Sequence, residues 1–265
     1  MKLLFVGDVI GKPGRQALLR LLPGLVDKRR ADYVVVNVEN AAGGFGVTPE
    51  ILQEIEELPI DCLTSGNHIW DKKEGLELLA PRNGARPLLR PANYPEGNPG
   101  TGVHVGETAA GIPVAVLNLE GQVFMKNVDS PFAVADRLLA GLPKDVKVVM
   151  VDFHAEATSE KQAIAYHLDG RVSAVFGTHT HVPTADERVL AGGTALVTDV
   201  GMTGPYDSII GFRAEKVLQR FLLQTPVGFE VAKRDVRLAA ALVDIDEATG
   251  KARSVERFLI KDEKA

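Results

Sequence analysis

The chain contains a single cysteine, Cys62, among its 265 residues, so it cannot form an internal disulfide. Cys62 lies in an apolar segment, which predicts a buried thiol in a reducing compartment. The sequence also lacks any apolar run near the roughly 20 residues that a membrane-spanning helix needs. Residues 1–6 are too short for a signal peptide. We therefore expect a cytoplasmic protein with no membrane partner.

An excess of basic residues is also absent. The chain has 30 Lys and Arg against 35 Asp and Glu, and its net charge is −5 at pH 7. Proteins that bind long nucleic acids generally carry basic surfaces, because neutralising phosphates drives their affinity. The basic run at residues 28–30 ends a predicted helix, where cations favour the helix dipole. We expect no binding of long nucleic acid, whereas a small phosphorylated ligand held by bound metal ions is compatible with an acidic protein.

Short β-branched apolar runs alternate with segments of helical periodicity along the chain. The patterns predict strands at residues 2–7, 33–38, 61–64, 112–119, 146–152 and 172–177. They predict helices at residues 13–28, 48–58, 131–142 and 159–167. This alternation is typical of parallel β-α-β units.

The remaining segments are richer in turn residues or in strand formers. Residues 81–106 contain much Pro, Gly, Asn and Arg, so we expect them to run over the surface, with a strand at 103–105. Residues 188–200 predict a hairpin. Residues 227–260 predict mostly strand, with a turn at 247–250. The fold class that fits is α/β, a two-sheet β-sandwich flanked by helices on both sides, in one domain over residues 1–265.

Acidic, amide and imidazole side chains stand at or just past the ends of predicted strands: Asp8, Glu39, Asn67, His154 and His179. Ligands gather at the carboxyl ends of strands in α/β sheets, so these residues are expected to converge if their strands are neighbours. His179 and His181 would project to one side of an extended backbone. Such ligands suit hard or borderline metal ions, and two ions about 3.5–4 Å apart need a bridging carboxylate, for which Glu39 is the natural candidate.

Taken singly, each of these residues has an ordinary explanation. A strand-end Asp commonly caps a turn or helix, and a lone His is commonly a hydrogen-bonded polar group. The ordered set is more specific than its members, and it indicates a dinuclear metal hydrolase.

Three motifs resemble those of the calcineurin-like metallophosphoesterases: Gly7-Asp8, Gly66-Asn67-His68 and Gly177-Thr178-His179-Thr180-His181. The segments at residues 5–11, 38–44 and 199–205 are similar to the bacterial YmdB-like branch, and the similarity extends through most of the chain. Ile10 stands where the wider superfamily has a histidine, and Glu39-Asn40 replaces its bridging Gly-Asp. The YmdB-like branch shows both changes. The resemblance implies the four-layer αββα fold of the family.

The resemblance also implies two sets of metal ligands that share Glu39. Asp8, Glu39, Asn40 and His181 would hold one ion, and Glu39, Asn67, His154 and His179 would hold the other. Asn40 would take the position that the missing histidine leaves open. His68 would be the catalytic residue that protonates the leaving oxygen, with an ordinary hydrogen-bonding role as the alternative. Fe or Mn are the expected ions and Zn is also compatible with these ligands, although no thiolate is offered for a structural zinc site.

The activity implied is that of a dinuclear-metal phosphodiesterase, which hydrolyses 2′,3′-cyclic nucleotides or related phosphodiesters through a metal-bound hydroxide. A phosphomonoesterase with the same metal core is one alternative. A metal-bearing regulatory scaffold that binds an RNA-processing partner is the other. The expected partner is a small phosphodiester such as a cyclic nucleotide, and the chain size and middle segment suggest a homo-oligomer.

Two further segments are candidates for contacts with the substrate. Residues 11–15 fail the P-loop pattern, so surface charge is the favoured account of Lys12 and Arg15. Thr203, Tyr206 and Asp207 lie in a Gly-Pro loop, where they either rim the site or form a plain turn.

Overall fold

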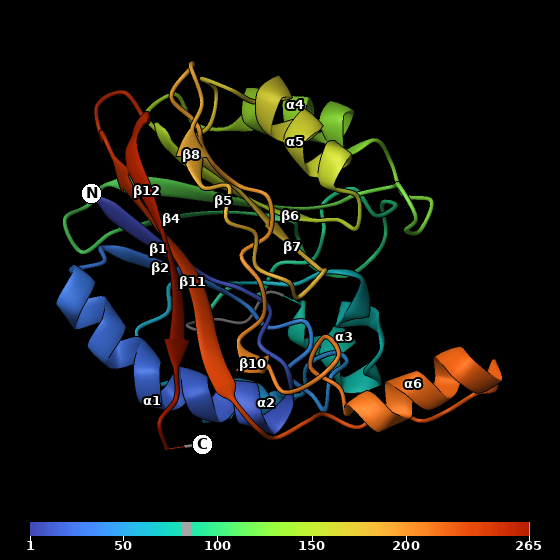
Figure 1. The fold of residues 1–265 in the computed structure, drawn as a ribbon. Helices are drawn as coiled ribbons and strands as arrows, with labels where there is room; N and C mark the ends of the chain where they lie inside the picture. The colour runs from blue at the N-terminus through green and yellow to red at the C-terminus, as the bar shows by residue number, and fades with distance from the viewer. Residues whose placement is uncertain (81–85, 265) are drawn as a thin grey trace.

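The computed structural model describes residues 1–80 and 86–264, and within them two six-stranded sheets lie face to face (Figure 1). The first sheet has the order β10-β11-β1-β2-β3, with β12 paired to β11. Its strands are β1 (Lys2–Val6), β2 (Tyr33–Asn37), β3 (Cys62–Thr64), β10 (Gly204–Pro205), β11 (Val236–Ile245) and β12 (Ala252–Lys261). The expected α/β class with two sheets is confirmed.

The second sheet has the order β4-β5-β6-β7-β9-β8. Its strands are β4 (Val103–Glu107), β5 (Pro113–Glu120), β6 (Val148–His154), β7 (Ala174–Thr178), β8 (Arg188–Val189) and β9 (Ala195–Val197). The predicted hairpin at residues 188–200 is present as the antiparallel pair β8–β9.

Helices cover the outer face of each sheet, which gives four layers in the order αββα (Figure 1). On the first sheet, α1 (Gly11–Arg29) and α2 (Pro49–Glu54) bury apolar side chains such as Leu18 and Leu22. On the second, α4 (Pro131–Gly141) and α5 (Thr158–His167) bury Val134 and Ile164.

Alternate side chains of β1 belong to two different hydrophobic cores. Leu4 and Val6 belong to the core beneath the helices of the first sheet. Leu3 and Phe5 point the other way, into the core between the two sheets, because successive strand residues face opposite sides. The ring of Phe5 stacks on Phe176 of β7, with the ring centroids 5.6 Å apart, so the sheets are joined by direct aromatic contact.

The direction of the strands places the functional motifs. In the first sheet β1, β2 and β3 run parallel, and in the second β5, β6, β7 and β9 run parallel. The carboxyl ends within each sheet therefore lie along one edge. The segments that follow β1, β2, β3, β6 and β7 carry the motifs.

Some predicted elements were wrong in extent. The helix predicted at residues 48–58 ends at Glu54, and residues 227–235 form only an isolated bridge before β11 begins. Three helical elements were not predicted, namely the 3₁₀ helix η1 (Asn67–Trp70), α3 (Lys73–Leu78) and α6 (Ala214–Leu223), nor was the short strand β10. Only Val217 of α6 is buried, so this helix lacks the wide apolar contact that makes a helix easy to recognise.

The prediction that residues 81–106 run over the surface was wrong for part of the segment, and residues 81–85 lie outside the described residues. Residues 88–91 are buried. The N–H of Leu89 donates to Leu63 O of β3, and the N–H of Ala92 donates to Asn118 O of β5. The segment is buried because it crosses from one sheet to the other. Among the described residues, no helix has the length and apolarity needed to cross a membrane.

Candidate metal centre

Three ligand atoms from three elements surround one ring nitrogen, Nε2 of His154. Asn67 Oδ1 and His179 Nδ1 each lie 3.0 Å from it, and Glu39 Oε1 lies 3.1 Å away. A ring nitrogen carries either one hydrogen or one lone pair, so it cannot bond to all three. Glu39, His154 and His179 meet the spacing expected of ligands to one metal ion. A single cation bound by these atoms would account for their close approach.

A second group gathers around Nε2 of His181. Asn40 Oδ1 lies 3.3 Å from this nitrogen and Asp8 Oδ2 lies 3.8 Å from it. The N–H of His179 donates to Asp8 Oδ2 at 2.9 Å, which joins this group to the first. The structure thus brings all seven suggested ligands into two adjacent groups, with Glu39 in contact with the His154 group.

The chemistry of these groups fits a cation. Asp8 and Glu39 are fully buried. Among the described residues, Asp8 Oδ1 has no hydrogen-bond partner and Glu39 Oε1 has none besides its approach to His154 Nε2. A buried carboxylate oxygen without a partner is costly, unless a positive charge compensates it. Imidazole nitrogens and amide oxygens complete a ligand set suited to Mn, Fe or Zn.

The pKa values of the buried groups depend on one another. Burial raises the pKa of Asp8 well above its usual range. Burial opposes ionisation of Glu39 too, but the adjacent His154 imidazole lowers the pKa of Glu39 to about 2. Burial disfavours the imidazolium, yet Glu39 raises the pKa of His154 to about 9. The two residues therefore hold a proton where a cation would compete for the same lone pairs.

The other nitrogen of each imidazole has a partner that fixes the ring. His154 Nδ1 lies 2.9 Å from Thr178 Oγ1, and His179 Nε2 lies 3.1 Å from Glu156 Oε2. His181 Nδ1 lies 2.8 Å from the carbonyl oxygen of Ile210. Such outer contacts set the tautomer and direct the remaining nitrogen toward a metal.

A buried network lies behind His154. Thr178 Oγ1 donates to Asp152 Oδ1 at 2.8 Å, and Asp152 Oδ2 accepts from Asn37 Nδ2 at 2.9 Å and from Thr64. Asn37 Oδ1 in turn accepts from the N–H of Glu39. The network joins β6 and β7 to β2 and β3, so it ties ligands of both sheets together.

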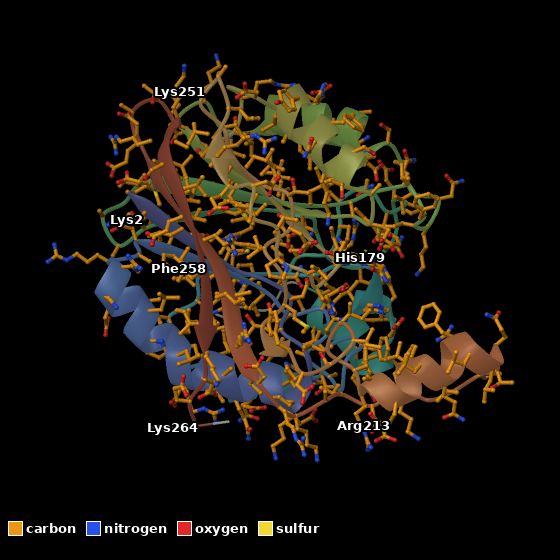
Figure 2. The ribbon with its side chains drawn as sticks, in the orientation of Figure 1. Lys2, His179, Arg213, Lys251, Phe258 and Lys264 are labelled. Carbon is orange, nitrogen blue, oxygen red and sulfur yellow. The ribbon has the colours of Figure 1, made fainter. Side chains whose placement is uncertain are left out.

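The turn that carries His179 and His181 was predicted wrongly as extended backbone. The φ angles are 101° at His179 and 66° at His181, both in the left-handed region. The two side chains therefore diverge into the two ligand groups, and Figure 2 shows His179 toward the side of the molecule that carries α3.

Glycines in the motifs keep space open for the ligands. A Cβ on Gly66 would lie 2.3 Å from His154 Nε2 and 2.4 Å from Glu39 Oε2. A Cβ on Gly7 would lie 2.0 Å from Gly201 O, and one on Gly177 would lie 1.8 Å from Thr198 O. Any side chain at these positions would displace the backbone that presents a ligand.

His68 stands beside the ligand groups and is partly exposed. Its N–H donates to Glu39 Oε2 at 3.1 Å, and its Nδ1 lies 2.8 Å from Asp71 Oδ2. The edge of the imidazole meets the Phe45 ring with centroids 4.9 Å apart. These contacts orient the ring and leave Nε2 free of protein partners among the described residues.

The candidate substrate contacts near the N-terminus and at residues 203–207 differ in their distance from the ligand groups. Arg15 donates to Glu54 Oε2 and to Ala41 O, both at 2.6 Å, so it braces the loop after β2. Lys12 is exposed. Thr203 does border the centre, since its N–H donates to Asp8 O at 2.9 Å.

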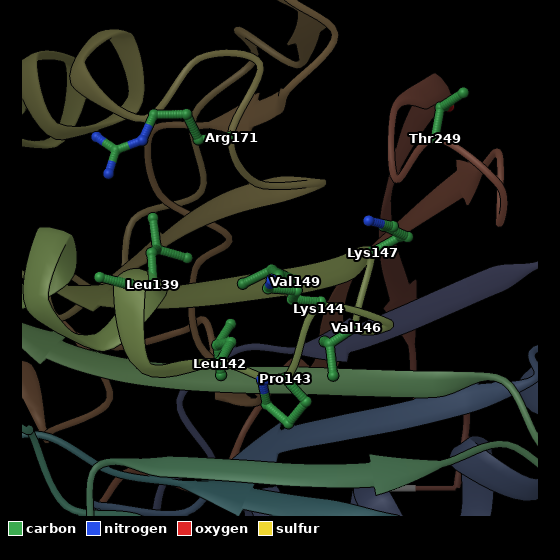
Figure 3. Close-up of a pocket in the computed structure, with 10 residues that line it drawn as sticks. Leu139, Leu142, Pro143, Lys144, Val146, Lys147, Val149, Arg171 and Thr249 are labelled. Atoms are coloured by element: carbon green, nitrogen blue, oxygen red, sulfur yellow. The ribbon is translucent and has the colours of Figure 1, made fainter.

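A surface cavity of about 520 Å³ lies elsewhere (Figure 3). Its lining includes Val146, Lys147 and Val149, near the start of β6, whereas His154 ends that strand. The cavity is therefore separate from the ligand groups.

Roles were not predicted for six residues that contact the suggested ligands, His68 or their neighbours: Asp152, Thr178, Glu156, Asp71, Lys161 and Asp199. Asp152 could have been found, because it is two residues from His154 on a strand and must share its face. Asp71 is three residues from His68, within one turn of the helix, whereas the remaining contacts join distant segments.

Comparison with known proteins agrees with this geometry. The family described as YmdB-like protein matches residues 4–258. The 2′,3′-cyclic-nucleotide 2′-phosphodiesterase of Bacillus subtilis (strain 168) is 46% identical over 263 residues, which cover 99% of this chain and 98% of the relative.

Two solved structures are similar throughout. A hypothetical protein from Thermus thermophilus superimposes with a TM-score of 0.92 at 42% identity, covering 99% of this chain and 100% of that one. A novel phosphatase from Mycoplasma pneumoniae gives a TM-score of 0.90 at 35% identity, covering 100% of this chain and 95% of that one. The chain therefore belongs to the YmdB-like branch of the calcineurin-like metallophosphoesterases.

Proposed function

We propose that the protein is a dinuclear-metal phosphodiesterase that hydrolyses 2′,3′-cyclic nucleotides or related phosphodiesters. The observation that carries the proposal is the pair of ligand groups around His154 and His181, with the buried carboxylate of Glu39 3.1 Å from His154 Nε2. The name of the Bacillus subtilis relative supports the substrate class.

Asp8, Asn40 and His181 would hold one ion, and Asn67, His154 and His179 the other, with Glu39 shared. Fe or Mn are the proposed ions, with Zn also suited to the site. When bound, two such ions would supply positive charge for the phosphoryl oxygens and would lower the pKa of a water, so that hydroxide becomes available near neutral pH.

His68 provides the proton for the departing oxygen. Asp71 Oδ2 lies 2.8 Å from Nδ1 and orients the ring, so Nε2 is the atom that would donate the proton. A positioned acid of this kind contributes roughly 10²–10⁴-fold in rate. Because the His68 N–H also donates to Glu39 Oε2, the acid is fixed relative to the Glu39 carboxylate.

A phosphomonoesterase is the second candidate, supported by the description of the Mycoplasma pneumoniae structure as a novel phosphatase. A regulatory scaffold is less well supported, because a scaffold has no need of the oriented His68. The cytoplasmic location and the homo-oligomer stay predictions.

The test uses protein stripped of metal and reloaded with Mn²⁺. Turnover of 2′,3′-cyclic AMP is compared with that of the monoester 3′-AMP, in the wild type and in Glu39→Gln. Hydrolysis of the cyclic diester by the wild type, and its loss in Glu39→Gln, is the expected result. Asp262→Asn is the matched control, because this carboxylate is also buried but binds Arg20 outside the site.

Preference for 3′-AMP would favour the monoesterase. If wild-type protein with bound Mn²⁺ hydrolysed neither compound, the phosphodiesterase proposal would be wrong.

A further inference from the structure

We infer that the buried ion pair of Lys161 and Asp199 is a positioning device that fixes the turn carrying His179 and His181. This inference rests on the proposed function, since it concerns two of the proposed metal ligands. Neither residue of the pair reaches the ligand groups itself, so both act through the turn.

The two side chains come from different elements. Lys161 lies in α5 and Asp199 follows β9, and each is 1% exposed. The Lys161 Nζ donates to Asp199 Oδ2 at 2.7 Å. The Lys161 side chain also passes the end of β7, because a Cβ on Gly177 would lie 3.0 Å from its Cδ.

Asp199 binds the turn through Oδ2 and its own loop through Oδ1. Its Oδ2 accepts from the N–H of Thr180 at 3.2 Å and from Thr180 Oγ1 at 2.7 Å. Its Oδ1 accepts from the N–H of Gly201 at 2.8 Å. Thr180 is the residue between the two histidines, so the carboxylate holds the centre of the turn.

The backbone of this turn is unfavourable without stabilising contacts. His179 and His181 both have left-handed φ angles, which non-glycine residues seldom adopt. Unfavourable backbone of this kind persists only where surrounding contacts fix it. Here the contacts include the bonds from Thr180 to Asp199, at the centre of the turn.

Lys161 supplies the positive charge beside this carboxylate. Burying a carboxylate is costly without a compensating charge. Without Lys161, Asp199 would lose its bond to the ammonium group and would turn toward water, and the bonds to Thr180 would weaken. The two histidines would then lose their fixed separation.

The test compares Mn²⁺ affinity with thermal stability. Lys161→Met alone leaves an unpaired buried carboxylate, so the informative variant is Lys161→Met/Asp199→Asn, which removes both charges at similar volume. We expect this double variant to melt near the wild-type temperature but to bind Mn²⁺ about 10- to 100-fold more weakly by isothermal titration. Thr180→Val, which removes only the hydroxyl bond, should show a smaller loss in the same direction.

Arg20→Met is the matched control, because it removes another ion pair, with Asp262, away from the turn. It should leave Mn²⁺ affinity unchanged. Wild-type affinity in both the double variant and Thr180→Val would overturn the positioning role, as would an equal loss in Arg20→Met. If the wild type bound no Mn²⁺, the proposed function would itself fail and this inference with it.

Discussion

At the scale of single residues, the centre combines buried carboxylates with imidazoles whose orientation is fixed. Asp8 and Glu39 place two fully buried carboxyl groups among the imidazoles, whereas the His68 side chain is partly exposed. Metal binding and proton transfer are thus assigned to different side chains, and substitutions can separate them.

His68→Ala should lower turnover of 2′,3′-cyclic AMP by roughly 10²–10⁴-fold, because the leaving oxygen loses its proton donor. The Mn²⁺ content per chain should stay at the wild-type value. His167→Ala is the control, because His167 pairs with Asp136 on the surface. A parallel loss of bound Mn²⁺ in His68→Ala would show that His68 is a ligand instead.

Glu120 gives a pH-dependent prediction. It ends β5 beside His154, and burial raises its pKa to about 7. Above pH 4.5 the unfolded chain releases this proton while the folded chain retains it until about pH 7, so stability present at low pH is lost as the pH rises. In metal-stripped protein, wild type should lose up to about 3 kcal/mol relative to Glu120→Gln between pH 4 and pH 8.

Urea unfolding of both proteins at the two pH values measures this difference. The glutamine does not titrate, so it isolates the contribution of Glu120. An unfolding free-energy difference that stays constant with pH would contradict a raised pKa.

At the scale of elements, the centre depends on short strand-to-loop transitions in which a glycine lets a ligand approach. Gly66 joins β3 to η1 and lies against His154 and Glu39. Ligands that belong to different sheets can meet here only because this backbone passes so close.

Gly66→Ala should abolish or strongly weaken Mn²⁺ binding, because its Cβ would stand 2.3 Å from His154 Nε2. Gly24→Ala is the matched control, since this glycine lies inside α1 with nothing within 4 Å of a Cβ. That substitution should stabilise the protein by about 0.5–1 kcal/mol through helix propensity. Isothermal titration and urea unfolding measure both effects, and undiminished Mn²⁺ binding by Gly66→Ala would contradict the close approach.

The strands and the convergence of the suggested ligands could be predicted from the sequence, because motif order and strand periodicity are local properties. What could not be predicted depends on tertiary contacts. The left-handed turn at His179 and His181 is bound by Asp199, which follows the β8–β9 hairpin and pairs with a lysine of α5. The buried segment at residues 88–91, which passes from one sheet to the other, has the composition of a surface loop, because Pro and Arg are usually exposed.

At the scale of the whole molecule, the candidate centre bridges the two halves of the sandwich. Asp8, Glu39 and Asn67 follow strands of the first sheet, whereas His154 and His179 come from the second. Bound ions would therefore link the sheets at the edge where their carboxyl ends meet.

Chelation should consequently lower the thermal midpoint. Ions at 100 times their Kd stabilise a protein by about 2.7 kcal/mol, which corresponds to roughly 5–10 °C for a chain of this size. Differential scanning calorimetry with and without EDTA measures the shift. Glu39→Gln should melt at the same temperature in both conditions, and an equal EDTA effect on this variant would show that the ions bind elsewhere.

The most direct test of the two-ion centre is a titration of metal-stripped protein with Mn²⁺, in which turnover of 2′,3′-cyclic AMP is followed against the number of ions bound per chain. Two ligand groups that share Glu39 predict little activity with one ion bound and full activity with two. Full activity with one ion bound, or turnover by the stripped protein, would contradict a dinuclear phosphodiesterase.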